Sequence, residues 1–283
     1  MYTIKNPAWL LMFLLGRFNF MRNLVSLFHQ VKDLDKYQER HSIFKDIEVD
    51  LVVKSLQRDG YYLGINLPPA LIDEITQLAY STKIQARNYN ANLSFFYSDK
   101  TQLNTEDSNT FVHGFYTDVS SRIPSIKKLE NDPKLLKIAA QYLDCEPVHI
   151  RTDLSWCFVA EKSAYEKNGG DAQILFHYDL DDYHALKFFF FITDVDLSSG
   201  PHVCIRGSHK KKKLFHQFSL LIGRSDREMV DYYGQENLIT ICGQAGFGFA
   251  EDPFCFHRGT PPIDKDRLML QIEFAVKNYG MWN

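Results

Sequence analysis

The apolar positions divide the chain into a first half with helical spacing and a second half of short, strand-like runs. Before about residue 147, apolar residues recur mainly every three or four positions, as on one face of a helix. Beyond it, short apolar runs are separated by clusters of Gly, Pro, Asp and Ser, which is typical of β-strands and turns. This pattern predicts an α+β protein in which helices come first and an antiparallel sandwich or barrel follows.

Helical spacing in the first half is clearest in three segments. It occurs within residues 33–59, in 68–81, which opens with two prolines, and in 131–143, where a proline again stands near the start. Residues 61–67 favour a short strand. We therefore expect three helices and one strand ahead of the β-rich half.

Residues 7–15 form an apolar run at the N-terminus that is too short to cross a bilayer, which takes about 20 such residues. No small-residue cleavage site follows the run, so it does not fit a secretory signal. A spacing of three and four predicts one amphipathic helix with this stripe: Leu11, Leu14, Phe18, Met21, Val25 and Phe28. We expect the stripe to pack on the rest of the protein or on a second copy in a homodimer. Weak membrane-surface contact through residues 7–28 is the alternative. Residues 1–45 are interpreted as an N-terminal amphipathic helical extension.

The second half contains six runs with the composition of strands. They are 147–160, 172–179, 185–195, 202–208, 236–243 and 267–276. In the run KFFFFITDV both faces are apolar until Thr193, which predicts a strand buried on both sides.

Composition adds constraints on partners and compartment. Lys plus Arg number 32 and Asp plus Glu 35, so the net charge of −3 gives no general attraction to nucleic acid. Five cysteines without CxxC spacing encode neither a disulfide framework nor a zinc ribbon, which fits a reducing, cytoplasmic setting. The lysine run 210–213 is interpreted as a solvated loop.

Four residues of the second half suggest metal chemistry. On a strand, residues two apart point to the same side, so His177 and Asp179 can converge on one point. His257 follows 80 residues later, and Arg267 opens the next strand-like run. Two histidines and one carboxylate form the facial triad of non-haem Fe(II) enzymes, and an arginine suits a second, distal carboxylate. The alternative is two ordinary strand-end histidines beside a turn aspartate.

The sequence around these residues resembles the phytanoyl-CoA dioxygenase family of Fe(II)/2-oxoglutarate-dependent oxygenases. The resemblance is continuous over about 172–276 and is carried by FHYDLDD, KFFFFITDVDLSSGPHVCIRGSHKK and GFGFAEDPFCFHRGTPPIDKDRLMLQIEF. A weaker similarity covers 58–79, and residues 1–45 show none. The resemblance implies a double-stranded β-helix, a cupin-like jelly-roll, over about 147–277 within a single domain at 46–283.

The resemblance also implies roles for individual residues. His177, Asp179 and His257 would be the iron ligands, and Arg267 would bind the distal carboxylate of 2-oxoglutarate. The candidates for further cosubstrate contacts are Thr260, Lys187, Thr152 and Ser155. The remaining histidines of this region are expected to be structural: His184, His202 and His209.

The implied activity is hydroxylation of a small molecule by Fe(II), 2-oxoglutarate and O2, with release of succinate and CO2. Related halogenases replace the carboxylate ligand with a small residue, so Asp179 favours hydroxylation. The polar segment 85–123 is expected to be a long loop, and its candidate substrate contacts are Asn88, His113 and Tyr116. Two alternatives stay open: a cupin-like metal enzyme that does not use 2-oxoglutarate, and a catalytically silent binding protein.

Overall fold

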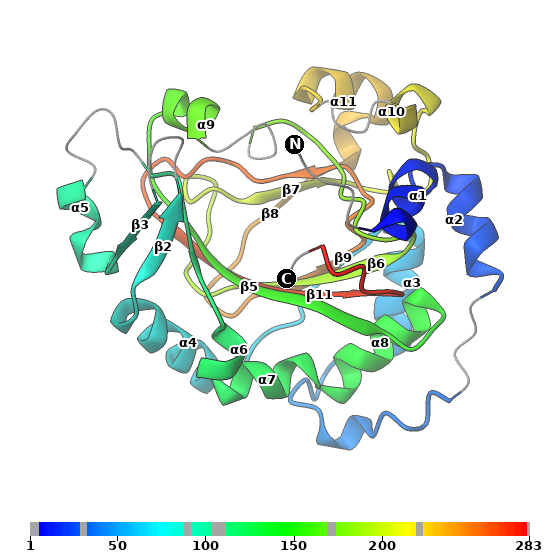
Figure 1. Ribbon diagram of the computed structural model, residues 1–283, viewed down its shortest axis with the longest axis horizontal. Coiled ribbons are helices and arrows are strands. Elements are labelled where there is room, and N and C mark those ends of the chain that lie inside the picture. The colour runs from blue at the N-terminus through cyan, green and yellow to red at the C-terminus, as the bar shows by residue number, and fades with distance from the viewer. Residues whose placement is uncertain are drawn as a thin grey trace.

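Two antiparallel sheets, flanked by helices, form the body of the protein (Figure 1). The computed structural model describes residues 6–28, 33–87, 92–103, 111–168, 174–218 and 223–281. Within these ranges the large sheet has eight strands in the order β1-β9-β6-β11-β5-β4-β2-β3, and the small sheet has three in the order β10-β7-β8. Helices precede most of the strands, as the sequence pattern predicts.

The strands have the following bounds: β1 (Tyr61–Leu63), β2 (Ile84–Arg87), β3 (Asn92–Phe95), β4 (His113–Tyr116), β5 (Val148–Cys157), β6 (Ala185–Phe191), β7 (His202–Ile205), β8 (Leu238–Ile241), β9 (Gly248–Glu251), β10 (His257–Arg258) and β11 (Arg267–Ala275). The α-helices are α1 (Pro7–Leu15), α2 (Asn19–Ser26), α3 (Val49–Asp59), α4 (Pro69–Ser81), α5 (Lys100–Leu103), α6 (Val119–Arg122), α7 (Pro124–Glu130), α8 (Pro133–Leu143), α9 (Lys162–Asn168), α10 (Leu214–Phe218) and α11 (Asp226–Tyr233).

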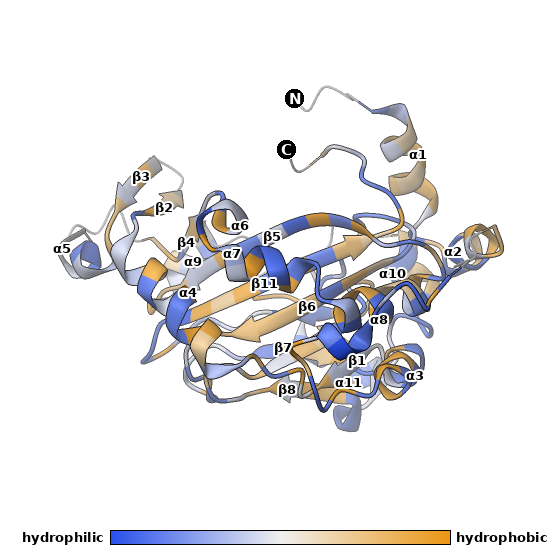
Figure 2. Cartoon of the chain, turned by 90° about the horizontal axis from the view of Figure 1, so that it is seen from below, coloured by the Kyte–Doolittle hydropathy of each residue, from blue (hydrophilic) through white to orange (hydrophobic). Residues whose placement is uncertain are grey.

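The central strand β6 is buried along its whole length, as its run of phenylalanines predicts, and it is orange in Figure 2. Phe188 and Phe190 pack into the core between the large sheet and helices α3, α4, α7 and α8. Phe189 and Phe191 point the other way, into a smaller apolar cluster shared with β7 and β8. The alternation of one strand thus joins two cores, one on each face of the large sheet.

The predicted helices of the first half are confirmed, with the expected ends. Helix α4 begins at a proline, and in α8 the Asp132 side chain accepts hydrogen bonds from two backbone N–H groups of the first turn. Helix α3 ends at Gly60, whose φ is 86°. A Cβ at this position would lie 2.2 Å from Cys255 Sγ and 2.7 Å from His209 Nδ1. Only glycine combines this conformation with so close an approach.

The prediction of a long loop over 85–123 is wrong for much of that segment. Strands β2, β3 and β4 lie there and extend the large sheet beyond β5. These strands are short and carry polar residues between buried ones such as Ile84 and Ala86, so their alternation is too brief to stand out in the sequence. Residues 104–110 lie outside the described part of the chain.

The segment 172–179 was expected to be a strand, but its described part, residues 174–179, forms β-bridges only at Phe176 and His177. The lysine run also differs from expectation. Three of its side chains are exposed, but Lys212 is buried, and its Nζ donates a hydrogen bond to the carbonyl of Phe254 at 2.7 Å. The same Nζ lies 4.0 to 4.4 Å from the centroids of three aromatic rings: Tyr178, Phe254 and Phe256.

The N-terminal segment forms two helices rather than one, and the predicted apolar stripe is not its buried face. Helix α1 packs on the body through Met12, while Leu11 and Leu14 are exposed. Gly16 still has a helical backbone, but Phe18 is extended, with φ −98° and ψ 123°. This extended residue separates α1 from α2, so the two helices do not continue one stripe. In the described ranges, no helix combines the length and the apolar character needed to cross a membrane.

Candidate metal centre

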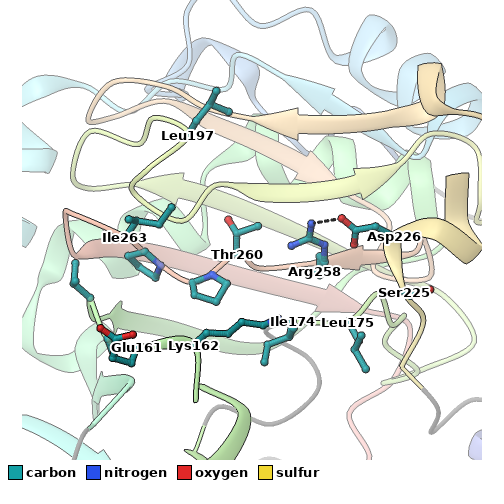
Figure 3. Close-up of a pocket in the computed structure, with 14 residues that line it drawn as sticks. Glu161, Lys162, Ile174, Leu175, Leu197, Ser225, Asp226, Arg258, Thr260 and Ile263 are labelled. Carbon is teal, nitrogen blue, oxygen red and sulfur yellow. Dashed lines mark hydrogen bonds and ion pairs between the residues drawn. The ribbon is translucent and has the colours of Figure 1, made fainter. Parts of the chain in front are cut away.

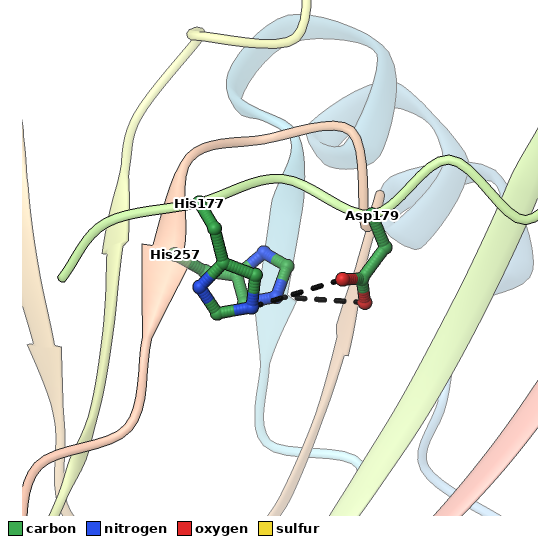
Figure 4. Close-up of side chains that lie close together, drawn as sticks. All are labelled: His177, Asp179 and His257. Atoms are coloured by element: carbon green, nitrogen blue, oxygen red, sulfur yellow. Dashed lines mark ion pairs between the residues drawn. The ribbon is translucent and has the colours of Figure 1, made fainter. Parts of the chain in front are cut away.

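His177, Asp179 and His257 lie together, and both imidazole rings face the Asp179 carboxylate (Figure 4). One ligand atom from each residue lies within 4.8 Å of the other two. The Nε2 atoms of the two histidines are 3.7 and 3.6 Å from the carboxylate oxygens of Asp179. Two imidazole nitrogens and a carboxylate facing one point form a donor set suited to a divalent transition metal.

Backbone hydrogen bonds hold the two histidines against each other. His177 N–H donates to the His257 carbonyl at 3.0 Å, and His257 N–H donates back at 2.8 Å. Each Nδ1 lies near a backbone carbonyl two residues earlier, that of Leu175 or Cys255. A proton on Nδ1 leaves the Nε2 lone pair free, which is the tautomer that a metal requires.

A buried lysine faces the carboxylate of this group. Lys187 Nζ is 2.5 Å from Asp179 Oδ2, 3.3 Å from Asp181 and 3.6 Å from Glu273. Burial alone would raise the pKa of Asp179, but the charge of Lys187 holds it well below the usual range. Asp179 is therefore an anion at neutral pH, as a metal ligand must be.

Beside His257 lies a second buried polar pair. His202 Nε2 is 2.8 Å from Glu251 Oε2, and the other carboxylate oxygen is 3.5 Å from His257 Nδ1. Burial raises the pKa of Glu251 to about 8 and lowers the pKa of His202 to about 3. At neutral pH the Glu251 carboxyl is therefore protonated and the His202 ring neutral, so the pair carries no net charge beside Nδ1 of His257.

The three residues open onto a cavity of about 350 Å³. On β6 and β11 the lining residues stand two apart, because side chains alternate along a strand. The remaining lining residues are Phe115, Tyr116, Arg151, Asp153, Leu154, Ser155, Lys187, Phe189, His202, Gly259, Arg267, Met269 and Gln271. Several of these side chains are charged, so the cavity suits a small charged ligand.

Arg267, at the start of β11, lines the same cavity and is 2% exposed. Its guanidinium donates to the carbonyl of Gly200 and, at 3.0 Å, to Cys157 Sγ. Its Nε is buried without a hydrogen-bond partner among the described residues. A buried cation with an unused donor fits an anionic ligand such as a carboxylate.

Cys157 lies between Arg267 and His113, whose Nδ1 is 3.5 Å from the sulfur. Burial alone would raise the pKa of the Cys157 thiol, but the charges of Arg267 and His113 bring it down to about 6. A thiolate therefore faces the guanidinium at neutral pH.

Two of the four secondary cosubstrate candidates lie in the cavity wall. Ser155 and Lys187 line it. Thr152 lies on the opposite face of β5, where its hydroxyl is 2.6 Å from Glu130 Oε1 and 2.8 Å from His149 Nε2, so its assignment to the near carboxylate is wrong. The strand alternates, and residues 152 and 155 cannot face the same side.

Thr260 borders a larger, adjoining cavity of about 1020 Å³ (Figure 3). Its hydroxyl donates to the carbonyl of Pro201 at 2.5 Å. Arg258 lines the same cavity and pairs with Asp226. Thr260 thus lines a different cavity from the three candidate ligands. The Pro201 carbonyl that it contacts follows directly after the Gly200 carbonyl that Arg267 contacts.

The proposed substrate contacts receive little support from the fold. Tyr116 borders the smaller cavity, but its hydroxyl donates to the carbonyl of Ala79 in the helical core. His113 faces Cys157 and the ring of Tyr165 and is not among the residues that line the cavity. Asn88 lies outside the described residues.

The three histidines expected to be structural stand outside the candidate ligand group. His184 and His209 lie close to backbone carbonyls, those of Arg22 and Gln57. His202 differs from the other two because it lines the cavity, with its ring centroid 5.5 Å from that of His257.

Several polar residues that surround the candidate ligands were not predicted from the sequence. Asp181 and Glu273 reach Lys187, and Glu251 reaches His202 and His257. A usable signal was present in β11, since Gln271 and Glu273 stand four and six residues after Arg267 and therefore share its face. For Glu251 the sequence contains no comparable signal, because its neighbours in the fold, Lys187 on β6 and His202, are distant from it along the chain.

Comparisons with known proteins agree on the fold. No protein-family model matches the sequence, and no curated protein matches it either. Among solved structures, EctD from S. alaskensis with bound Fe has a TM-score of 0.52 at 16% identity, over 89% of this chain and 86% of that chain. EvdO2 from Micromonospora carbonacea var. aurantiaca, complexed with 2-oxoglutarate, gives 0.53 at 10% identity, over 82% and 92%. The non-haem α-ketoglutarate-dependent epimerase SnoN gives 0.51 at 15% identity, over 80% and 82%. The chain therefore shares the fold of these three proteins.

Proposed function

We propose that this protein is a non-haem Fe(II)/2-oxoglutarate-dependent dioxygenase that hydroxylates a small molecule and releases succinate and CO2. One observation carries the proposal. A facial group of two histidines and a carboxylate shares a 350 Å³ cavity with a buried arginine whose Nε has no partner in the described structure. This combination offers one site for a metal and one for a carboxylate.

His177, Asp179 and His257 would hold Fe(II), which supplies the activation of O2 when bound. The two imidazoles present Nε2, because their Nδ1 atoms face backbone carbonyls. Lys187 keeps the Asp179 carboxylate ionised and fixes its direction through the 2.5 Å contact. These roles follow from the donor set and its surroundings.

Arg267 would bind the distal carboxylate of 2-oxoglutarate at the far end of the cavity. Its guanidinium is held by the carbonyl of Gly200 and by Cys157, so it is oriented before the ligand arrives. Ser155 is the remaining candidate in the cavity wall for a contact to the cosubstrate. Preorganisation of this kind reduces the entropy lost on binding.

The jelly-roll assignment and the resemblance to the phytanoyl-CoA dioxygenase family belong to the same proposal. The apolar cluster that joins β6 and β9 to β7 and β8 supports two sheets packed face to face. One continuous core extends from Phe44 to Phe274. This core supports a single dioxygenase domain at 46–283 that follows an N-terminal extension.

The test is an anaerobic titration of metal-free protein with Fe(II) and then 2-oxoglutarate, monitored by the weak visible charge-transfer band of the chelate. We expect the band in the parent and its loss in His177→Ala. In Arg267→Ala the band should require at least about tenfold more 2-oxoglutarate, because a charge-assisted pair is removed. Two matched variants serve as controls and should behave as the parent: His184→Ala and Arg258→Ala.

A folded, iron-loaded parent without the band would overturn the 2-oxoglutarate assignment and favour a cupin-like metal enzyme. Failure to bind iron would favour a silent binding protein. The reaction type is tested separately, by product mass after turnover. Hydroxylation adds one oxygen atom to the substrate, whereas an epimerisation of the kind named for SnoN leaves the mass unchanged.

A further inference from the structure

Exposed apolar side chains gather on three short helices at one side of the molecule. Helices α1, α2 and α10, with the two residues that follow α2, carry nine large apolar side chains that are 46 to 82% exposed. They are Leu11, Leu14, Phe20, Leu24, Leu27, Phe28, Leu214, Phe215 and Phe218. We call these three helices and the lysines at 210, 211 and 213 the N-terminal surface. Patches of this kind usually mark a binding site.

Helices α1, α2 and α10 lie near one another at one side of the molecule (Figure 1), and contacts of Phe18 and Asn19 join α2 to α10 and to the lysine run. The rings of Phe18 and Phe218 meet edge to face, with centroids 5.0 Å apart. Asn19, at the start of α2, donates a hydrogen bond from Nδ2 to the carbonyl of Lys210 at 2.8 Å. Its backbone N–H donates to Gln217 Oε1 at 3.2 Å. The lysine loop and the apolar helices are therefore neighbours in space, although about 190 residues separate them.

The two segments that build this surface contain no acidic residue. Residues 1–32 carry four Lys or Arg side chains, and residues 206–224 carry six, while the whole chain has a net charge of −3. Lys210, Lys211 and Lys213 are exposed. The exposed positive charge of Lys210, Lys211 and Lys213 therefore lies beside the exposed apolar side chains of α2 and α10.

A cavity of about 560 Å³ lies beside the lysine loop. Arg206, Lys210 and Lys211 line it together with Tyr232, and the acid in its wall, Asp59, is paired with Arg58 at 2.6 Å. A cavity with unbalanced positive charge suits a phosphate group.

We propose that the N-terminal surface binds the face of a membrane rich in anionic lipids. Apolar side chains on short helices insert at the headgroup level, and neighbouring lysines attract the lipid phosphates. A second copy of the chain is a poorer occupant, because a symmetric contact would place the lysines of one copy against those of the other. This inference concerns a surface distinct from the candidate metal centre and does not depend on the proposed function.

The experiment is sedimentation of the full chain with vesicles of phosphatidylcholine alone or of phosphatidylcholine mixed with phosphatidylserine. We expect binding to the mixed vesicles only, and weaker binding at high salt. Charge reversal should reduce the affinity roughly 100-fold, since each lysine near an anionic surface contributes about fivefold. That variant is Lys210→Glu/Lys211→Glu/Lys213→Glu. Removal of apolar side chains should reduce the affinity by about tenfold or more. That variant is Phe20→Ser/Leu24→Ser/Phe215→Ser.

Matched controls are Lys54→Glu and Leu51→Ser, which change exposed residues of the same types on α3. Both should bind like the parent, and far-UV circular dichroism should show every variant folded. Equal binding to both vesicle types, or unchanged binding of both surface variants, overturns the proposal. So does a stable dimer in light scattering that dissociates in the apolar variant while no vesicle binding is seen, because the occupant is then a second copy.

Discussion

The cavity between the two sheets and the N-terminal surface distribute their side chains in opposite ways. Around the cavity, charged groups are buried: Lys187 and Arg267 are 2% exposed and Glu273 is fully covered. On the N-terminal surface, large apolar groups are exposed, with Leu27 at 74% and Phe28 at 82%. Each arrangement costs stability relative to the ordinary distribution. Buried charges at the cavity and exposed apolar groups on the N-terminal surface both depart from that distribution, and each departure indicates a binding site for a ligand.

The largest expected effect concerns the lysine in the cavity wall. Lys187→Met leaves the carboxylates of Asp179, Asp181 and Glu273 with less compensating charge in a buried site. We expect the free energy of unfolding to fall by about 3–5 kcal/mol, as measured by urea denaturation of the metal-free protein.

A second variant tests whether charge is the cause of this loss. Adding Asp181→Asn to Lys187→Met removes one of the uncompensated carboxylates and should recover at least about 1 kcal/mol. If the double variant is no more stable than the single one, lost packing rather than charge explains the effect.

A somewhat smaller effect is expected from Cys157, which should make the free energy of unfolding depend on pH. The ordinary pKa of a thiol is near 9, and in the folded protein the pKa of Cys157 is about 6. Between these values the unfolded chain binds more protons, so the contribution of Cys157 to stability grows as pH rises from 6 to 9 and is lost as pH falls to 6.

Replacement by serine should remove this dependence. The difference in unfolding free energy between the parent and Cys157→Ser should change by roughly 2–4 kcal/mol across that range. A difference that stays constant with pH would show that the thiol is not ionised beside Arg267.

The lysine run 210–213 allows the same contrast to be tested with one residue type, because Lys212 is buried and the other three lysines are exposed. Lys212→Met leaves the carbonyl of Phe254 without its donor and removes Nζ from its place over the three aromatic rings. The expected cost is about 1–2 kcal/mol in thermal or urea unfolding. Lys211→Met should change stability by no more than about 0.5 kcal/mol, since that side chain is exposed. Equal effects at the two positions would contradict the buried placement of Lys212.

The smallest effect is expected on the N-terminal surface. Leu24→Ser and Phe215→Ser remove side chains that are 46% and 60% exposed, so stability should change by less than about 0.5 kcal/mol each. Chemical denaturation measures this directly. A loss above about 1 kcal/mol would mean that these side chains are packed in solution, and the contrast with the cavity would weaken.

The sequence predicted the parts of the structure that rest on long or local patterns. The helices at 68–81 and 131–143 have prolines and a capping aspartate at their starts, so their beginnings could be located. The strand β6 could be identified as fully buried because both of its faces are apolar. The grouping of His177, Asp179 and His257 followed from spacing and order along the chain, and the structure brings the three together. Their role as metal ligands stays a prediction.

What the sequence did not predict depends on contacts that are distant along the chain. The face of α1 that is buried depends on a cluster in which Met12 packs with residues distant along the chain, such as Leu180 and Phe254. The partners of Lys187 come from two separate segments, Asp179 and Asp181 from one and Glu273 from the other, so no single local pattern shows them. The error at Thr152 is local. Thr152 and Ser155 are three residues apart on β5, so they point to opposite faces, and only Ser155 lines the cavity.

The glycine at the end of α3 has a consequence for the order of folding. Its carbonyl accepts a hydrogen bond from Asp252, and its missing side chain makes room for Cys255, two residues before His257. The placement of Cys255, and of the segment that continues to His257, therefore depends on a contact between residues nearly 200 positions apart. Contacts of such sequence separation form slowly. We therefore expect His257 to reach its place beside His177 and Asp179 late in folding.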